Sequence, residues 1–132
     1  MEEVKYEKEV EASHILIAWE GASNASEETT RTEEEAYEEA KVALAKITDE
    51  GKPFDRVAQF HSDDPSNKET GGKLSQAVTG DGTYVYDFEQ AALGLEASGD
   101  VSEIIKTEFG YHIIKADKVL NDVSQTKYQY TV

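Results

Sequence analysis

The strongest apolar run in the chain lies near its N-terminus, from Ala12 to Trp19, and is rich in residues that favour β-structure. Because both odd and even positions are apolar, we predict a strand that is buried on both faces. The next stretch, residues 21–31, contains Gly, Ser, Asn and Thr without any periodicity. We predict a surface loop there.

Helical spacing begins after this loop. Thr32 and Glu35 have the spacing of a capping box, and apolar residues then recur three or four positions apart until Gly51, where the helix should stop. A second, short helix is predicted from Pro53, because proline is favoured in the first turn. A third helix is predicted to be capped by Asp87.

The C-terminal part of the chain returns to β-type patterns. Residues 101–106 and 111–116 form two apolar runs, and residues 107–110 between them have the length of a tight hairpin turn. Residues 126–132 alternate between polar and apolar positions, as an edge strand does. A strand, then helices, then a hairpin indicates an α+β fold with an antiparallel sheet.

Length and charge limit the class of protein. A chain of 132 residues suits one domain, which we place at 1–132 with a core at about 10–119 and a tail or edge strand at 120–132. The chain has 13 Lys+Arg and 28 Asp+Glu, so its formal net charge is −15. Nucleic acid and anionic membrane surfaces both need a basic footprint, so we expect neither as a partner.

Cysteine is absent, which excludes disulfides, thiolate metal sites and a cysteine nucleophile. No apolar run approaches the roughly 20 residues of a membrane span, and the first residues do not have the pattern of a signal peptide. We therefore expect no membrane insertion by this chain and a monomer as an isolated domain.

Two of the three histidines lie within predicted strands, at His14 and His112. Each alone is most simply a core histidine with a hydrogen-bond partner. If the two strands are neighbours, however, the imidazoles meet in the middle of the sheet and need polar partners, because unpaired buried polar groups are costly. Asp63, Asp64 and Thr107 are the candidate partners.

Other chemistries are less well supported by the sequence. Two histidines and an aspartate have the composition of a metal site, but no ligand spacing such as HExxH is present, so no metal is expected. Paired-carboxylate hydrolysis is also open in a chain with 28 acidic residues, although the acidic run 33–39 is most simply a solvated helix face.

Five short segments together resemble the parvulin-type peptidyl-prolyl isomerases. They occur in the order that is usual for the family, and the resemblance covers roughly residues 10–119. The segments are SHIL at 13–16, SDDPS at 62–66, GGKL at 71–74, FEQAA at 88–92 and TEFGYHII at 107–114.

This resemblance implies a parvulin/FKBP-like four-stranded antiparallel sheet surrounded by about four helices. It also implies catalysis of rotation about X–Pro bonds without a cofactor. Carried over position by position, the resemblance assigns two sets of residues. The catalytic set is His14, Asp64, Thr107 and His112, and the substrate-binding set is Leu74, Tyr84, Phe88 and Phe109.

The chain also departs from the family pattern around its pocket. Tyr84 stands where a pocket methionine is usual, and Asp87 stands where proline usually precedes the phenylalanine. The aromatic pair that commonly follows the glycine segment is missing. A catalytically weak or inactive domain that binds polypeptide as a chaperone module is therefore the alternative to an active isomerase.

Charge indicates the substrate class. Phosphate-directed parvulins present a cluster of basic residues in the loop after the first strand. Here that loop holds Glu20, Glu27 and Glu28, with Arg31 as its only base. We expect phosphorylation-independent binding of proline-containing unfolded polypeptides, with basic segments tolerated better than acidic ones. The similarity to cell-envelope foldase domains implies an extracytoplasmic location within a longer parent, with a cytoplasmic location as the alternative.

Overall fold

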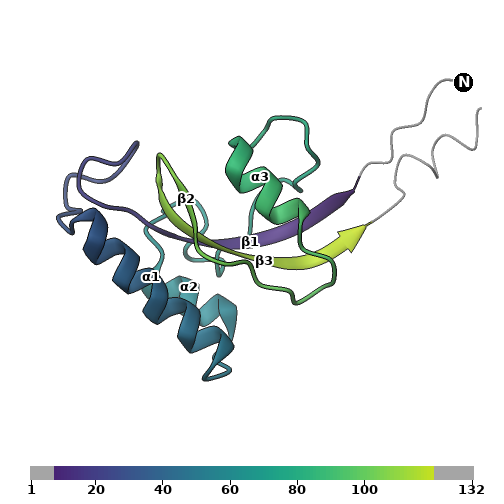
Figure 1. Ribbon diagram of the computed structural model, residues 1–132, viewed down its shortest axis with the longest axis horizontal. Helices are drawn as coiled ribbons and strands as arrows, with labels where there is room; N and C mark the ends of the chain where they lie inside the picture. The colour runs from purple at the N-terminus through teal and green to yellow at the C-terminus, as the bar shows by residue number, and fades with distance from the viewer. Residues whose placement is uncertain (1–7, 121–132) are drawn as a thin grey trace, which may run out of the picture.

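The computed structural model describes residues 8–120, which form an antiparallel sheet with helices on both faces (Figure 1). The elements are β1 (Glu9–Ile17), α1 (Glu33–Thr48), α2 (Phe54–His61), α3 (Tyr86–Leu93), β2 (Ile105–Thr107) and β3 (Gly110–Leu120). The strand order is β1-β3-β2, with both pairs antiparallel. The predicted α+β class is confirmed.

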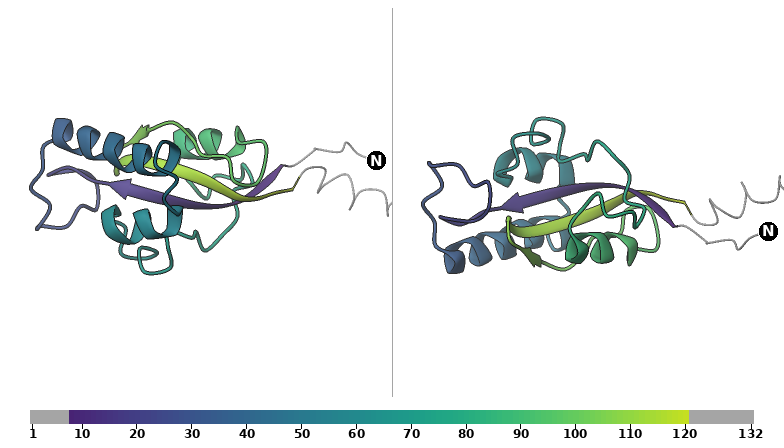
Figure 2. Two further views of the ribbon diagram at one scale, coloured as in Figure 1. Left: turned by 90° about the horizontal axis from the view of Figure 1, so that it is seen from below. Right: turned by 90° about the horizontal axis from the view of Figure 1, so that it is seen from above.

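β1 and β3, the first and last elements in sequence, run side by side over most of the length of the molecule (Figure 2). Their alternating side chains separate two hydrophobic clusters. On one face, Ile15, Ile17 and Ile113 pack against α1 and α2. On the other face, Ile114 packs against Phe88 of α3. β1 is thus covered on both faces, as its apolar pattern predicted.

The fourth strand expected from the family resemblance is replaced by irregular chain within the described residues. Residues 72–78 lie along the free edge of β1, where Ser13 is bridged to Lys73 and Val10 to Val78. Between these bridges β1 advances three residues and the opposite segment five, so the segment loops out and the ladder is interrupted. This segment still protects the edge of the sheet.

Helix boundaries follow the predictions closely at α1. Thr32 is the N-cap, its hydroxyl accepts a hydrogen bond from the Glu35 amide, and the Glu35 carboxylate accepts one from the Thr32 amide. The helix ends at Thr48, just before the expected stop at Gly51. At α2, Pro53 is the N-cap rather than the first helical residue.

One prediction about the helices is wrong, and their number within the described residues is smaller than expected. Asp87 does not cap α3, because the helix begins one residue earlier at Tyr86 and the N-cap, Val85, makes no side-chain hydrogen bond. About four helices were expected, and three are found within residues 8–120. Between Asp64 and Gly71 the chain instead makes turns, including one bond from the Lys68 amide to the Asp64 carbonyl at 3.0 Å.

The C-terminal hairpin is confirmed, although its first strand is shorter than predicted. Of residues 101–106 only the end joins β2, while Val101 makes an isolated bridge to Lys115. Ser102 explains the interruption, because its hydroxyl takes the place of a main-chain carbonyl and accepts the Ile114 amide at 2.9 Å. The edge strand predicted at 126–132 lies outside the described residues. No helix in the described part of the chain is long and apolar enough to cross a membrane.

Candidate active site

The two strand histidines meet in the middle of the sheet, as predicted. The register of β1 and β3 places Leu16 opposite His112 and His14 opposite Ile114, so the two imidazoles lie diagonally on one face. Their Nδ1 atoms are 3.2 Å apart, and each residue is about 95% buried, with 5% of His14 and 4% of His112 exposed. Neither imidazole can therefore depend on solvent for its hydrogen bonds.

Asp64 and Thr107 satisfy the outer nitrogens of the pair. His14 Nε2 lies 2.8 Å from the Asp64 carboxylate, and His112 Nε2 lies 2.7 Å from the Thr107 hydroxyl. The Phe109 amide in turn donates to the Thr107 oxygen at 3.1 Å. The structure therefore brings all four predicted catalytic side chains into one hydrogen-bonded chain, which runs across the sheet.

The protonation state of His112 limits its hydrogen bonding. Burial, reinforced by the nearby His14 ring, lowers the pKa of His112 to about 3, so this imidazole is neutral at physiological pH. A neutral imidazole donates from one nitrogen and accepts at the other. His112 therefore donates to one of its two partners, Thr107 and His14, and accepts from the other, while His14 Nε2 donates to the Asp64 carboxylate, which can only accept.

Asp64 ends this chain as a carboxylate. Its hydrogen bond to His14 is the largest of the influences that hold its pKa well below the usual range, and it outweighs partial burial. The amide and hydroxyl of Ser66 also donate to the second carboxylate oxygen, at 2.9 and 2.6 Å. Asp64 is thus both ionised and rigidly held.

The loop that carries Asp64 is attached to β1 by Ser62, the C-cap of α2. The Ser62 hydroxyl accepts the Leu16 amide at 3.1 Å, and the Asp63 amide donates to the Leu16 carbonyl at 2.7 Å. Asp63, a predicted partner of the histidines, does not join them. Its carboxylate accepts from the Ala18 amide and from the guanidinium of Arg31.

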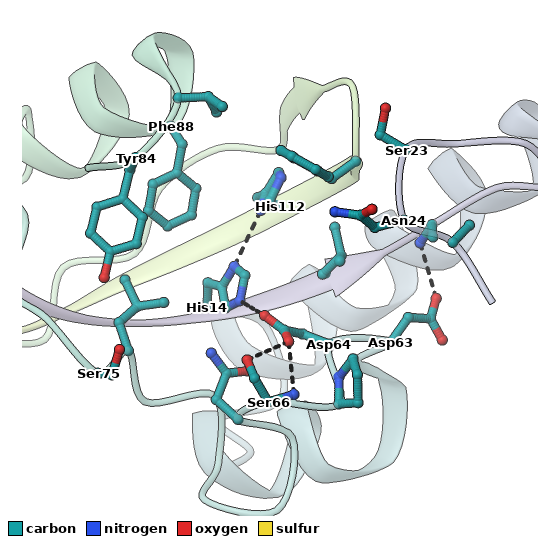
Figure 3. Close-up of a pocket in the computed structure, with 18 of the residues that line it drawn as sticks. His14, Ser23, Asn24, Asp63, Asp64, Ser66, Ser75, Tyr84, Phe88 and His112 are labelled. Carbon is teal, nitrogen blue, oxygen red and sulfur yellow. Dashed lines mark hydrogen bonds and ion pairs between the residues drawn. The ribbon is translucent and has the colours of Figure 1, made fainter. Parts of the chain in front are cut away.

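A cavity of about 480 Å³ opens beside the histidine pair (Figure 3). Phe88 stands edge-on to His14 and to His112, with ring centroids 5.5 and 5.1 Å apart. Tyr84 lies 5.3 Å from Phe88, and its hydroxyl donates to the Gln76 carbonyl at 2.7 Å. All four predicted substrate-binding residues line this cavity: Leu74, Tyr84, Phe88 and Phe109. Thr107 is not among the lining residues and supports His112 from behind.

The wall formed by the loop after β1 differs from the expectation drawn from its acidic composition. Glu20, Glu27 and Glu28 do not line the cavity, and the residues of this loop that do are neutral. Arg31 is held by Asp63 and by Glu39, at 3.3 Å from the latter. The neutral wall residues, which the sequence did not single out because small polar residues carry no specific signal, are Ser23, Asn24, Ala25, Ser26 and Thr29.

Asn67 also lines the cavity and was not predicted as a site residue. Asn67 lies in the turn-rich segment after Asp64, where an asparagine is ordinarily explained by turn formation.

Among the described residues, no three His, Cys, Asp or Glu side chains converge as ligands for a metal ion.

Comparison with known proteins agrees with the site geometry. Residues 1–119 match the family described as the PPIC-type PPIase domain. Foldase protein PrsA 4 of Bacillus cereus is 37% identical over 110 residues, which cover 83% of this chain and 32% of that protein. The chain thus spans about a third of the length of this relative.

Solved structures show the same fold. Peptidyl-prolyl isomerase ESS1 from Candida albicans superposes with a TM-score of 0.73 at 29% identity, over 82% of this chain and 62% of that one. The PrsA peptidylprolyl isomerase of Bacillus cereus superposes with a TM-score of 0.66 at 32% identity, over 95% of this chain and 40% of that one. This chain therefore belongs to the PPIC-type parvulin family of peptidyl-prolyl isomerases and is homologous to the PrsA foldases of Gram-positive bacteria.

Proposed function

We propose that this chain accelerates rotation about X–Pro bonds in unfolded or newly exported polypeptides, by a non-covalent mechanism without a cofactor. The observation that carries this proposal is the aromatic cavity placed directly against a buried, fully hydrogen-bonded histidine pair. A proline ring is apolar and compact, and the cavity walls Leu74 and Phe88 suit it.

The reaction requires little from the protein. Peptide rotation has a barrier of about 18–20 kcal/mol because conjugation is lost when the amide twists. No bond breaks, so neither a nucleophile nor a metal is needed. A thousandfold acceleration corresponds to only about 4 kcal/mol, which differential binding of the twisted amide supplies.

Each part of the site then has a role in that binding. The aromatic walls hold the proline ring, while the rest of the substrate is free to rotate. The hydrogen-bonded chain holds the Asp64 carboxylate and the two imidazoles at one edge of the cavity, where their charge and dipoles act on the amide as its polarity changes. Because these groups are already in place, they need not reorganise during rotation.

Phosphorylation-independent binding is part of the proposal. A phosphate-directed site needs several free cations, whereas Lys73 is the one Lys or Arg that lines this cavity and the loop after β1 contributes none. Arg31 is already neutralised by Asp63 and Glu39. We expect a phosphoserine-proline peptide to isomerise no faster than the matching glutamate-proline peptide, measured by cis–trans kinetics. A phosphopeptide preference of tenfold or more would contradict this part.

The names of the relatives support the proposed clients. The homologous proteins are called foldases, which points to unfolded polypeptides. We propose that this domain works outside the cytoplasm as part of a longer protein. Fusion to a reporter that is active in only one compartment, in the native host, tests the location.

The central experiment measures cis-to-trans kinetics on a short X–Pro peptide with the wild-type chain and with His14→Ala and Asp64→Ala. Hydrogen bonds to charged groups contribute about 1.5–3 kcal/mol, so we expect Asp64→Ala to lower kcat/KM by about tenfold or more. Asp49→Ala, which removes an exposed carboxylate at the end of α1, is the matched control and should not change the rate. A wild-type rate equal to that of buffer alone would refute the proposed catalysis.

Tyr84 favours the second candidate function, a polypeptide-binding module with weak or no catalysis. Its ring lies against Phe88 and its hydroxyl is bonded to Gln76, so it occupies space at the cavity wall. This candidate predicts that the chain suppresses aggregation of an unfolded protein without accelerating isomerisation. Tyr84→Met should then restore catalysis.

A further inference from the structure

Asn67 is unusual among the residues of the candidate active site. It is 6% exposed, and its side-chain oxygen Oδ1 is the one buried side-chain polar atom without a hydrogen-bond partner within the described residues 8–120. Buried polar atoms are nearly always paired, because an unmade hydrogen bond destabilises the fold. The carboxamide of Asn67 therefore requires an explanation.

The conformation of the loop does not provide one. The backbone of Asn67 is not in the left-handed conformation. Among the non-glycine residues within 8–120, Asn24 is the one with a positive φ. The contribution of Asn67 to the loop comes from the main chain, since its carbonyl accepts the amides of Gly72 at 2.7 Å and Thr70 at 3.1 Å. Any residue could make these bonds, so the fold alone does not need an asparagine here.

The place of Asn67 provides the explanation. It lines the same cavity as His14, three residues after Asp64 and next to Ser66. Figure 3 shows this wall, with Asp64 and Ser66, below the histidine pair, while Tyr84 and Phe88 lie to the left of His112. A polypeptide bound with its proline between these walls passes Asn67.

The chemistry of the unpaired atom specifies its partner. An amide oxygen is an acceptor, so the partner must be a donor. Because Oδ1 is itself buried, the group must rotate about χ2, a torsion with a broad profile, for this oxygen to reach a donor in the cavity. The donor that polypeptides offer whatever their side chains is the main-chain N–H.

We propose that Asn67 is a substrate-binding residue whose Oδ1 accepts a hydrogen bond from a main-chain N–H beside the bound proline. The inference rests on the proposed function of the cavity and goes beyond it, because it states how this chain holds a client. Recognition of the main chain does not depend on side chains, which suits a protein that acts on many unfolded sequences.

Substitution separates this role from a structural one. We expect Asn67→Ala and Asn67→Leu to raise KM about two- to tenfold, the range expected for loss of one hydrogen bond, with kcat changed less than twofold. The melting temperature should stay constant or rise in Asn67→Leu, because an unpaired buried oxygen is removed. Glu69→Gln, an exposed change in the same loop away from the cavity, is the control. A lower melting temperature with unchanged KM would show a structural role and overturn the inference.

A modified substrate tests the bond itself. Replacing the peptide N–H on either side of the proline by an ester oxygen removes the donor without removing the chain. One of the two ester peptides should bind the wild-type chain about two- to tenfold more weakly and should bind Asn67→Ala as well as the parent peptide does. Equal losses in wild-type and variant for both esters would overturn the inference.

Binding measured without turnover keeps the two proposals distinguishable. Titration of the ¹⁵N-labelled chain with the peptide should shift the side-chain amide signals of Asn67, whether or not the peptide is isomerised. Absence of catalysis with a clear shift would refute the proposed isomerase activity but support binding by Asn67. Catalysis with no shift at Asn67 would refute the inference alone.

Discussion

At Thr107 one hydroxyl serves two neighbours, since it bonds to His112 and accepts the Phe109 amide. Thr107→Val keeps the shape but leaves both groups unpaired. We expect it to lower kcat/KM about tenfold and to destabilise the fold by about 1–3 kcal/mol. Thr107→Ser keeps the hydroxyl and should stay within about twofold of wild-type activity. Peptide kinetics and urea unfolding check both variants, and equal effects of Val and Ser would contradict this role.

His112 makes the stability depend on pH. Its pKa is about 3 in the folded chain and about 6.5 when unfolded, so below pH 6.5 the unfolded state binds a proton that the folded state does not. Stability is therefore fully present above pH 6.5 and falls as pH decreases toward 3, by up to about 1.4 kcal/mol per pH unit. Asp64, whose pKa is lowered from 3.8, adds a loss in the same direction at the acid end.

Urea unfolding measured between neutral pH and about pH 4 tests this dependence. His112→Gln removes the titrating imidazole but keeps a polar side chain, so its stability should fall less steeply over this range. The titratable groups outside the contact with His14 and Asp64 are common to both proteins and cancel in the comparison. Equal slopes for the variant and the wild type would contradict the assignment of a neutral His112.

At the scale of elements, the glycine segment positions the edge of β1. Gly72 has a φ of +89°, and a Cβ there would overlap the carbonyl oxygen of His14. Gly82 has a nearly equal φ of +86°, but a Cβ there would meet open space. Gly82→Ala should therefore cost only the backbone strain, about 1–2 kcal/mol, whereas Gly72→Ala should cost substantially more and displace His14.

Urea unfolding and peptide kinetics on this matched pair separate strain from steric overlap. We expect Gly82→Ala to keep its activity, and Gly72→Ala to lose most of it even at temperatures where it remains folded. Similar stability and activity in the two variants would show that the contact between Gly72 and β1 does not position the site.

Secondary-structure elements were predictable where the signal is local. The capping box at Thr32 and the turn at 107–110 depend on residues close in sequence, and both are confirmed. The Asp87 cap failed because its neighbours Val85 and Tyr86 already adopt the geometry of the helix start. The fourth strand is absent from residues 8–120 because of two extra residues opposite β1, which no local pattern reveals.

At the scale of the whole molecule, the net charge of −15 acts on clients before they reach the site. The field should favour a peptide with lysines over one with glutamates, because the loop wall of the cavity is neutral and the charged side chains that do line it, Asp63, Asp64 and Lys73, add a net charge of −1. We expect KM to differ about two- to fivefold at ~0.01 M salt and to converge at ~1 M, where the Debye length falls from about 30 to about 3 Å.

Peptide kinetics at both salt concentrations check this prediction, with an uncharged peptide of equal length as the control. The uncharged peptide should show a KM that hardly depends on salt. A lower KM for the glutamate peptide at low salt would contradict it and would indicate a local cation that dominates over the net charge.

The sequence by itself determined the α+β class and the family and predicted eight site residues, because strand and helix periods and the five family segments are properties of consecutive residues. Only the tertiary structure decided which groups meet. It joined His14 to Asp64 and His112 to Thr107, excluded Asp63, and kept the loop carboxylates away from the cavity. It also showed that Asn67 is buried without a partner, because burial and hydrogen bonding depend on distant parts of the chain that pack together.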